Sequence, residues 1–426
     1  SIQWKKLWTK KQEFDKGKIK DYMKHIPEEG YDPGDWWPKA DQMQDRVKKN
    51  RKTGAGLDGW ANRYLAALPI QFWEEFERLI HAILKKGATL PQAWNMVRVT
   101  LIPKPDGGTR PIGVASALWR LIGGVICNNL IPWTFKWLHP SMFGGIPNRG
   151  IDDIHHIISS IIAKATEEEG IMGFKTDLSK CFDRIEVDAA LCVLERMGLP
   201  REVQELIRNF YRDQITYFNA NGLVTQEPFP REIGALQGCS FSVMFILAFQ
   251  AILSTSLEKE IEKRAGRKGE MEESEDDFKK WFLGSFLDDR IILTWGRAKR
   301  RLYSIISNYI FEADKCFGFV WNFGKGEQFA TGEEDKQCIE SRQDERLGKL
   351  VQEFRNSGID YTCAVEDNKT GRKMSDKTIH RMVRQLTRID KIIKSEKRKI
   401  HFVNQLIIPK FTWAAAWRSY DKPQEL

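Results

Sequence analysis

Two adjacent aspartates, Asp288 and Asp289, lie between two stretches rich in apolar and aromatic residues, 281–287 and 291–295. Runs of this kind on both sides of a short acidic interruption predict two β-strands joined by a tight hairpin turn. Adjacent carboxylates repel each other unless a cation lies between them. The hairpin is therefore a candidate metal site, although a turn exposed to solvent would account for the same residues.

A second acidic position precedes the hairpin in the sequence. Asp177 ends a short mixed run, 170–176, and a helix-like stretch from Val187 to Met197 follows. This placement fits either a ligand at the end of a strand or the N-cap of a helix. Together with Asp288 and Asp289, Asp177 supplies the hard oxygen ligands that two Mg²⁺ ions need, and such paired ions lie roughly 3.5–4 Å apart.

Further segments follow in a fixed order around these aspartates. They comprise 56–69, 101–112, 143–153, 177–183, 234–242, 286–289 and 318–325. In order and approximate spacing they resemble the motifs of reverse transcriptases, and those of non-LTR retrotransposons and group II introns look most similar. The resemblance covers about residues 54–331. Two departures from the usual motifs are Leu287, before the paired aspartates, and Val243, where a proline is often found.

The resemblance implies an α+β fold, the right-hand polymerase, with fingers, a palm built on an antiparallel sheet and a helical thumb. A chain of 426 residues with 42% hydrophobic content has room for several subdomains around a core. The expected divisions are an N-terminal extension (1–53), fingers with upstream palm elements (54–170), a palm (171–331) with a charged insertion (257–280), a polar insertion (332–378) and a basic helical thumb (379–426).

The same resemblance assigns catalytic roles. It implies metal binding by Asp177 and Asp288, with Asp289 as the neighbouring carboxylate. The expected cofactor is a pair of Mg²⁺ ions, for which Mn²⁺ can substitute. Lys325 is expected to protonate the leaving pyrophosphate as a general acid. The match around Lys325 is looser, so a plain surface lysine is the alternative.

Other residues are expected to bind the incoming dNTP. Alternating apolar residues from 97 to 101 and a turn at 106–108 predict a β-hairpin that carries Lys104 and Arg110. These cations are expected to grip the triphosphate. The resemblance places Phe182 under the sugar, where its ring would clash with a ribose 2′-OH, and Gln237 and Gly238 near the nascent base pair. The alternatives are a hairpin made soluble by its charges and a core position for Phe182.

The overall charge fits a polyanionic partner, since the net charge is +9 and the pI is about 9.0. Seven cysteines without a CxxC pair argue against a disulfide framework or a zinc knuckle. No signal peptide is visible, and the longest apolar stretch, Val243 to Leu253, is too short to span a membrane. We therefore expect no membrane partner and an intracellular location, the nucleus for a eukaryotic retroelement or the cytoplasm for a prokaryotic one.

Basic residues recur at helical spacing near the end of the chain. An apolar stripe accompanies them, comprising Ile379, Met382, Val383, Leu386, Ile389 and Ile393. A helix with an apolar back and a basic face suits a thumb that follows a duplex backbone. An ordinary amphipathic surface helix would show the same pattern. The candidate nucleic-acid-binding residues are Arg381, Arg384, Arg388 and Lys391.

The expected function is that of an RNA-directed DNA polymerase, which copies an RNA template from a DNA or RNA primer with dNTPs. An RNA-directed RNA polymerase shares the palm, but that class usually relies on an Asn after the middle motif, and none lies between Gly234 and Leu253. A domesticated RNA-binding palm without polymerase activity is the second alternative, which the three retained aspartates disfavour. The sequence leaves the template and the oligomeric state open.

Overall fold

The computed structural model describes residues 2–9, 14–87, 89–104, 108–168, 170–220, 223–229, 231–265, 274–362 and 376–409. These residues form two compact units, each assembled from three separate stretches of the chain. The first unit comprises 1–142, 178–260 and 309–320, and the second comprises 143–177, 261–308 and 321–426. Because the chain enters each unit more than once, residues far apart in the sequence share one core.

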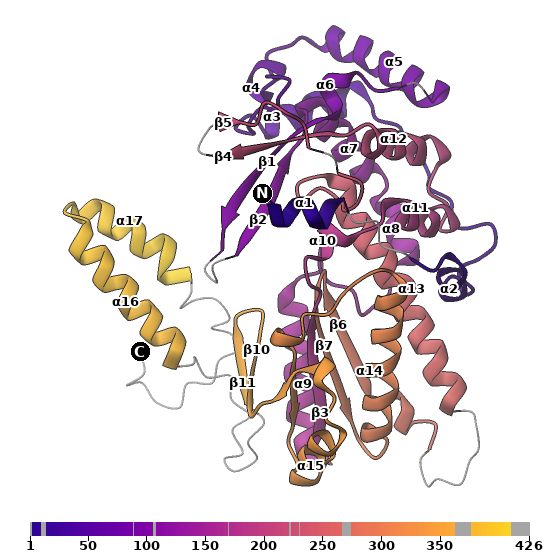
Figure 1. Ribbon diagram of the computed structural model, residues 1–426, viewed down its shortest axis with the longest axis vertical. Helices are drawn as coiled ribbons and strands as arrows, with labels where there is room; N and C mark the ends of the chain where they lie inside the picture. Colours follow the sequence, from indigo (N-terminus) through magenta and orange to yellow (C-terminus); the bar gives the residue numbers. More distant parts are fainter. Residues whose placement is uncertain are drawn as a thin grey trace. The chain divides into compact units, whose positions relative to one another are not determined.

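A five-stranded sheet forms the centre of the second unit, with the strand order β6-β7-β3-β8-β9. Figure 1 labels β3, β6 and β7 of this sheet. Neighbouring strands are antiparallel except β8 and β9, which are parallel. The hairpin predicted around Asp288 and Asp289 is confirmed as β6–β7. The strands are β3 (Ile171–Asp177), β6 (Trp281–Phe286), β7 (Asp289–Trp295), β8 (Glu327–Ala330) and β9 (Lys349–Leu350).

Side chains along each strand alternate between the two faces of this sheet. On one face, Ile171, Leu293 and Phe329 join a core with the apolar side of α9 and with the hairpin β10–β11. On the other face, the ring of Phe174 meets the edge of Tyr303 on α14, with 5.2 Å between ring centroids. The bounds are α9 (Ile151–Glu168), α14 (Lys299–Cys316), β10 (Glu353–Asn356) and β11 (Ile359–Thr362).

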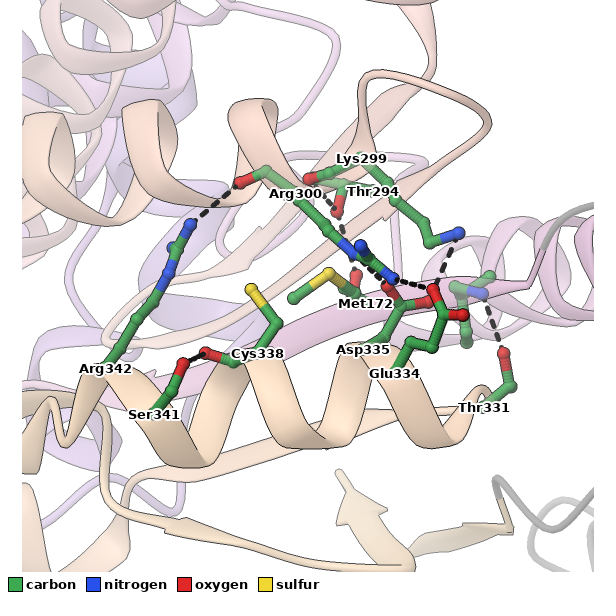
Figure 2. Close-up of polar contacts among 11 residues, drawn as sticks. Met172, Thr294, Lys299, Arg300, Thr331, Glu334, Asp335, Cys338, Ser341 and Arg342 are labelled. Atoms are coloured by element: carbon green, nitrogen blue, oxygen red, sulfur yellow. Dashed lines mark hydrogen bonds and ion pairs between the residues drawn. The ribbon is translucent and has the colours of Figure 1, made fainter.

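Helix α15 (Glu333–Arg342) is fastened to the start of α14 by charged side chains, as Figure 2 shows. The buried carboxylate of Asp335 accepts a hydrogen bond from Arg300 at 2.6 Å and pairs with Lys299 at 3.2 Å. At the other end of α15, Arg342 donates to the carbonyl oxygen of Arg300 at 3.3 Å. These contacts give order to part of the segment predicted as a polar insertion (332–378), whose residues 363–375 lie outside the described ranges.

The first unit contains a four-stranded sheet with the order β2-β1-β4-β5. Strands β1 and β2 are antiparallel, which confirms the predicted β-hairpin; residues 105–107 of its turn lie outside the described ranges. Strand β4 pairs with β1 in parallel. The strands are β1 (Met96–Pro103), β2 (Thr109–Val114), β4 (Ile215–Ala220) and β5 (Leu223–Val224).

The rest of the first unit is largely helical. Helix α5 buries Trp73, Phe76, Ile80 and Leu84 at helical spacing, and it ends at Gly87, whose φ of +59° suits glycine. The helices of the first unit are α1 (Ile2–Trp8), α2 (Lys16–Tyr22), α3 (Ala40–Lys49), α4 (Asn62–Leu65), α5 (Ile70–Lys86), α6 (Gln92–Asn95), α7 (Ala117–Asn129), α8 (Ile131–Trp137), α10 (Cys181–Arg184), α11 (Val187–Arg196), α12 (Arg201–Arg212) and α13 (Ser240–Ala265).

Helix α13 is the one helix among the described residues that is long and apolar enough to cross a membrane by length and composition. In the protein, 83% of its apolar stretch is buried. A helix that is apolar all round and covered by other elements is typical of a core. Its core position explains the length of the apolar run that follows Gln237 and Gly238.

Helices α16 (Asp376–Ile392) and α17 (Glu396–Leu406) complete the described part of the chain. An ion pair between Asp390 and Lys399, at 2.8 Å, joins them. The apolar stripe predicted for α16 is buried at Ile389 and exposed at Val383 and Leu386. The rest of the predicted thumb, 410–426, lies outside the described residues.

Candidate active site

The acidic hairpin β6–β7 closes through a turn of two residues, Leu287 and Asp288, because Phe286 and Asp289 are register partners. Leu287 has a φ of +57°, which lies in the left-handed region. A positive φ at the first central position is typical of a type II′ turn, where glycine is usual. Leucine in this conformation costs roughly 1–2 kcal/mol. Local strain of this kind clusters at functional sites.

The turn packs closely against the backbone at Gly144. A Cβ atom added to Gly144 would lie 2.7 Å from the amide nitrogen of Leu287 and 2.9 Å from the carbonyl carbon of Phe286. The neighbouring Phe143 N–H donates to the carbonyl oxygen of Ser285 at 2.9 Å. Only glycine therefore fits at position 144. This close approach explains the glycine at that position of the segment 143–153.

Asp177 is the last residue of β3 and the register partner of Asp289 on β7. The predicted strand-end position is therefore confirmed, and the alternative that Asp177 caps a helix is wrong, because the N-cap of α10 is Lys180. Residues directly opposite each other on antiparallel strands point to one face, with Cβ atoms roughly 4.5–5.5 Å apart. The strand register thus brings two carboxylates together from distant parts of the sequence.

Charge repulsion perturbs this pair. Partial burial, followed by the negative charges of Asp288 and Asp177, raises the pKa of Asp289 to about 6. Lys175 and Lys325 oppose the shift through their positive charges. The site therefore holds more negative charge than its two neighbouring lysines neutralise, which is the electrostatic condition that favours a bound cation.

Lys325 lies where the sequence analysis expects it, next to the carboxylates. Its Nζ is 3.0 Å from Oδ2 of Asp177, and the same oxygen accepts a hydrogen bond from Nδ2 of Asn322 at 3.1 Å. Partial burial disfavours the charged amine, but the hydrogen bond to Asp177 and the charges of Asp289 and Asp288 outweigh it, so the pKa of Lys325 is raised. Lys325 is therefore a protonated amine at neutral pH.

Two neighbouring residues were given no role from the sequence. Asn322 lies in the matched segment 318–325 and precedes the short 3₁₀ helix η2 (Phe323–Lys325), and its amide orients Asp177. Lys175 lies two residues before Asp177 on the same face of β3 and pairs with Glu327 at 3.1 Å. Period-two alternation from Asp177 would have found Lys175.

The donors suit a hard cation, since Asp177, Asp288 and Asp289 offer carboxylate oxygens. Among the described residues, however, no group of three or more His, Cys, Asp or Glu side chains converges as a set of metal ligands. One oxygen of Asp177 is already shared by Lys325 and Asn322. The chemistry of the donors thus fits Mg²⁺, while Asp177 is held by Lys325 and Asn322.

The first unit brings the predicted sugar and base-pair residues together. The carbonyl oxygen of Phe182, which is half-buried, accepts the N–H of Ala235 at 2.7 Å, and the carbonyl oxygen of Gln237 accepts the N–H of Gly113 at 3.1 Å. Gly238 has a φ of +117°, and a Cβ there would lie 2.8 Å from the Gly113 carbonyl oxygen. Glycine is therefore required at position 238 for this close approach to β2.

The predicted triphosphate residues lie on the β1–β2 hairpin. Lys104 closes it through its N–H, which donates to the carbonyl oxygen of Gly108 at 2.7 Å, and Arg110 on β2 is exposed opposite Ile102. In the second unit, the four basic residues predicted for the thumb are all exposed and lie on α16. They are Arg381, Arg384, Arg388 and Lys391.

Comparison with known proteins identifies this arrangement. The family described as reverse transcriptase (RNA-dependent DNA polymerase) matches residues 102–320, which is more than half of the chain. That range contains Asp177, Asp288 and Asp289 as well as the predicted dNTP residues, whereas Lys325 and the thumb residues follow it. The carboxylates of the acidic hairpin therefore lie within the family's own domain.

Solved structures of telomerases are similar to this chain. A C-terminally truncated apo telomerase from Candida tropicalis aligns with 16% identity and a TM-score of 0.46, over 70% of this chain and 60% of that one. Telomerase from Candida albicans, in complex with a fragment of telomeric RNA, aligns with 12% identity and a TM-score of 0.40, over 83% and 60%. The chain thus spans about 60% of the length of these structures. By its sequence, the chain belongs to the reverse transcriptase (RNA-dependent DNA polymerase) family, and its fold is the α+β fold expected for that family.

Proposed function

We propose that this protein is the RNA-directed DNA polymerase of a non-LTR-type retroelement, with a group II intron protein as the nearest alternative origin. It would extend the 3′-OH of a DNA or RNA primer with dNTPs on an RNA template. The observation that carries this proposal is the pairing of Asp177 with Asp289 across β3 and β7, next to Asp288 and Lys325. The same constellation is what phosphoryl transfer needs, namely fixed charges around a reacting phosphate.

Two Mg²⁺ ions, or Mn²⁺ in their place, would be held by Asp177 and Asp288, with Asp289 as the neighbouring carboxylate. When bound, they would supply charge neutralisation at the α-phosphate and at the attacking and leaving oxygens. The pairing of Asp177 with Asp289 supports a cation here, because the carboxylates repel one another without one. The left-handed conformation of Leu287 sets the backbone of the turn, from which the side chains of Asp288 and Asp289 project.

Lys325 would act as the proton donor to the leaving pyrophosphate. Its raised pKa keeps the amine protonated at neutral pH, as a general acid requires. The side chain is half exposed and its ion pair with Asp177 is the contact that it would have to give up. Asp177 would hold a cation, and Lys325 would donate the proton once this ion pair is released.

The remaining residues would bind substrate and template. Lys104 and Arg110 are placed together on the β1–β2 hairpin and would grip the triphosphate. Phe182 and Gln237 lie on hydrogen-bonded neighbouring segments, and would contact the sugar and the nascent base pair. The exposed basic residues of α16 would follow the phosphate backbone of the RNA–DNA duplex.

Primer extension on an RNA template tests this proposal. A labelled DNA primer is supplied with Mg²⁺ and either dNTPs or rNTPs in separate reactions. We expect extension with dNTPs only. Extension with rNTPs alone would move the protein to the RNA polymerases, and binding of the primer–template without extension would indicate an inactive RNA-binding palm.

The sugar gate gives a second, independent test. Phe182→Ala should raise incorporation of rNTPs relative to dNTPs, because the clash with the ribose 2′-OH is removed, while Phe182→Tyr should keep the discrimination of the parent enzyme. Phe278→Ala, at a buried phenylalanine in the second unit, is the matched control and should leave the rNTP to dNTP ratio unchanged. An unchanged ratio in Phe182→Ala would show that Phe182 is a core residue.

A further inference from the structure

Asp183 is a buried carboxylate that the proposed chemistry does not use. It lies on α10, next to Phe182, and 1% of its surface is exposed. Burial raises the pKa of Asp183, while Arg231, Trp8 and Gln237 oppose the rise. Burying a carboxylate destabilises the folded protein unless the carboxylate is paired and hydrogen-bonded, so the partners of Asp183 stabilise it in this position. One of these partners is Gln237, whose Nε2 donates to Oδ2 of Asp183 at 3.1 Å.

The second partner comes from the other end of the sequence. Nε1 of Trp8, at the end of α1, donates to Oδ1 of Asp183 at 2.9 Å in a buried hydrogen bond. The Trp8 indole is fully buried and packs on the rings of Phe218 and Phe229, with centroid distances of 5.8 and 5.9 Å. Figure 1 shows α1 beside α10, in agreement with these contacts.

Arg231 completes the network. Its guanidinium lies 3.6 Å from Oδ1 of Asp183 and 4.3 Å from the ring centre of Trp8. It also donates to the carbonyl oxygens of Ile233 and Ala235, at 3.2 and 2.9 Å. These two carbonyls belong to residues 232–237, which we call the glutamine segment. The guanidinium of Arg231 therefore links Asp183, Trp8 and the backbone of the glutamine segment.

The backbone of Trp8 forms further hydrogen bonds with the glutamine segment. Its carbonyl oxygen accepts the N–H groups of Glu232 and Ile233, at 2.9 and 3.3 Å. Helix α1 also contacts the β1–β2 hairpin, since Nε1 of Trp4 donates to the hydroxyl of Thr109 at 3.0 Å. Thr109 is the neighbour of Arg110. One short helix thus contacts the β1–β2 hairpin, α10 and the glutamine segment.

We propose that Trp8 and Arg231 are positioning residues for the dNTP site, which hold Asp183 so that its carboxylate fixes the side chain of Gln237. The expected change in the KM for dNTP rests on the proposed function. The expected change in the position of the Gln237 side chain does not. Gln237 would be the residue that meets the nascent base pair, and Trp8 and Arg231 would act through it without touching the substrate. Helix α1 would therefore set the affinity and selectivity for the incoming nucleotide from a position outside the matched family range.

Trp8→Phe is the informative variant, because it keeps the ring and removes the N–H donor. Trp133→Phe is its matched control: Trp133 is equally buried, and its Nε1 donates to the carbonyl oxygen of Met197 at 3.0 Å, away from Asp183. Loss of a hydrogen bond to a charged group weakens an interaction by about tenfold or more. We expect Trp8→Phe to raise the KM for dNTP about tenfold with a smaller change in kcat, while Trp133→Phe leaves the KM unchanged.

A double-mutant cycle shows whether Trp8 acts through Gln237. If it does, Trp8→Phe combined with Gln237→Met should be no worse than Gln237→Met alone. Additive losses would overturn the inference. Arg231→Lys serves as a second variant, since it keeps the charge but not the fork of donors. It should show the same rise in KM and the same lack of additivity.

A measurement that does not depend on activity separates this inference from the proposed function. Glutamine labelled with ¹⁵N reports the side-chain amide of Gln237, which is assigned by its absence in Gln237→Met. We expect Trp8→Phe to shift or broaden this amide signal, and Trp133→Phe to leave it in place. An unmoved signal in Trp8→Phe would overturn the inference even in an active enzyme, and a moved signal would support it even if no DNA synthesis is detected.

Discussion

Asp177 and Asp289 are register partners on β3 and β7, so two carboxylates point to the same face of one sheet from adjacent strands. Like charges directly opposite each other destabilise a sheet. The chain keeps this unfavourable pair at the point where the acidic hairpin turns, next to Lys325 and Asn322. An unfavourable pair of carboxylates is expected where a functional site needs concentrated negative charge.

Removing one of the paired charges should stabilise the protein without ligands. We expect Asp289→Asn to raise the melting temperature at neutral pH by about 2 °C, because the repulsion from Asp177 and Asp288 disappears. Differential scanning calorimetry in EDTA measures this effect. Asp276→Asn, which removes an exposed aspartate whose ion pair with the exposed Lys279 contributes little, should leave the melting temperature unchanged. A fall in the melting temperature of Asp289→Asn would contradict the account of the pair.

Divalent cations should stabilise the native protein by binding to the carboxylates. A ligand at a hundred times its Kd contributes about 2.7 kcal/mol to the free energy of unfolding. We therefore expect Mg²⁺ or Mn²⁺ to raise the melting temperature of the parent protein and of Asp276→Asn, and to have little effect on Asp177→Asn or Asp288→Asn. An equal rise in all four proteins would place cation binding elsewhere.

The conformation of Leu287 makes an unusual prediction about glycine. Replacing alanine by glycine normally destabilises a protein, because glycine gains more freedom on unfolding. At position 287 the φ of +57° reverses the order, since alanine is strained there and glycine is not. We expect Leu287→Gly to be more stable than Leu287→Ala by about 1 kcal/mol in urea unfolding. The opposite order would show that the turn adopts another conformation.

Gly238 should tolerate no side chain. Gly238→Ala places a Cβ against the carbonyl oxygen of Gly113 and forces a φ of +117° on an alanine, so the glutamine segment must shift. We expect a loss of stability of about 1–3 kcal/mol together with loss of DNA synthesis. Gly54→Ala is the control, because a Cβ there meets nothing within 4 Å and the φ is not in the left-handed region. Equal activity of the two variants would show that position 238 is not constrained.

The basic face of α16 should contribute to binding of an RNA–DNA duplex through phosphates. The affinity of such contacts falls with salt, with a slope of about 0.9 in the logarithms for each phosphate neutralised on B-DNA. We expect Arg384→Gln and Arg388→Gln each to lower affinity and to reduce the slope by up to about 1, as measured by fluorescence anisotropy at several salt concentrations. Lys86→Gln on α5 removes an exposed charge elsewhere and should leave the slope unchanged. An unchanged slope in the α16 variants would identify an ordinary surface helix.

Local patterns predicted the elements better than the relations between them. Apolar and aromatic runs around Asp288 and Asp289 were enough to predict β6–β7, apolar alternation was enough for β1–β2, and helical spacing was enough for α16. These signals are local because each depends on a period of two or of 3.6 residues. The division into fingers, palm and thumb, and the roles of the site residues, stay predictions.

Contacts between distant residues could not be read in the same way. Trp8 and Asp183 are separated by 175 positions, and no period or motif connects an indole in a short N-terminal helix with a buried carboxylate. The register that opposes Asp177 to Asp289 follows from the pairing of β3 with β7, and a slip of one residue would turn one of them to the other face. Asn322 was missed for the same reason, because its amide meets Asp177 only in the folded chain.

The rate of a single nucleotide addition tests the central claim most directly. The parent protein, Asp177→Asn, Asp288→Asn and the control Asp276→Asn are each mixed with an RNA template, a DNA primer, Mg²⁺ and one dNTP under single-turnover conditions. Loss of a positioned charge at a phosphoryl transfer site costs about a hundredfold or more in rate. We predict such losses for Asp177→Asn and Asp288→Asn and a parent-like rate for Asp276→Asn. Undiminished extension by Asp177→Asn and Asp288→Asn would contradict the assignment of this site as the polymerase centre.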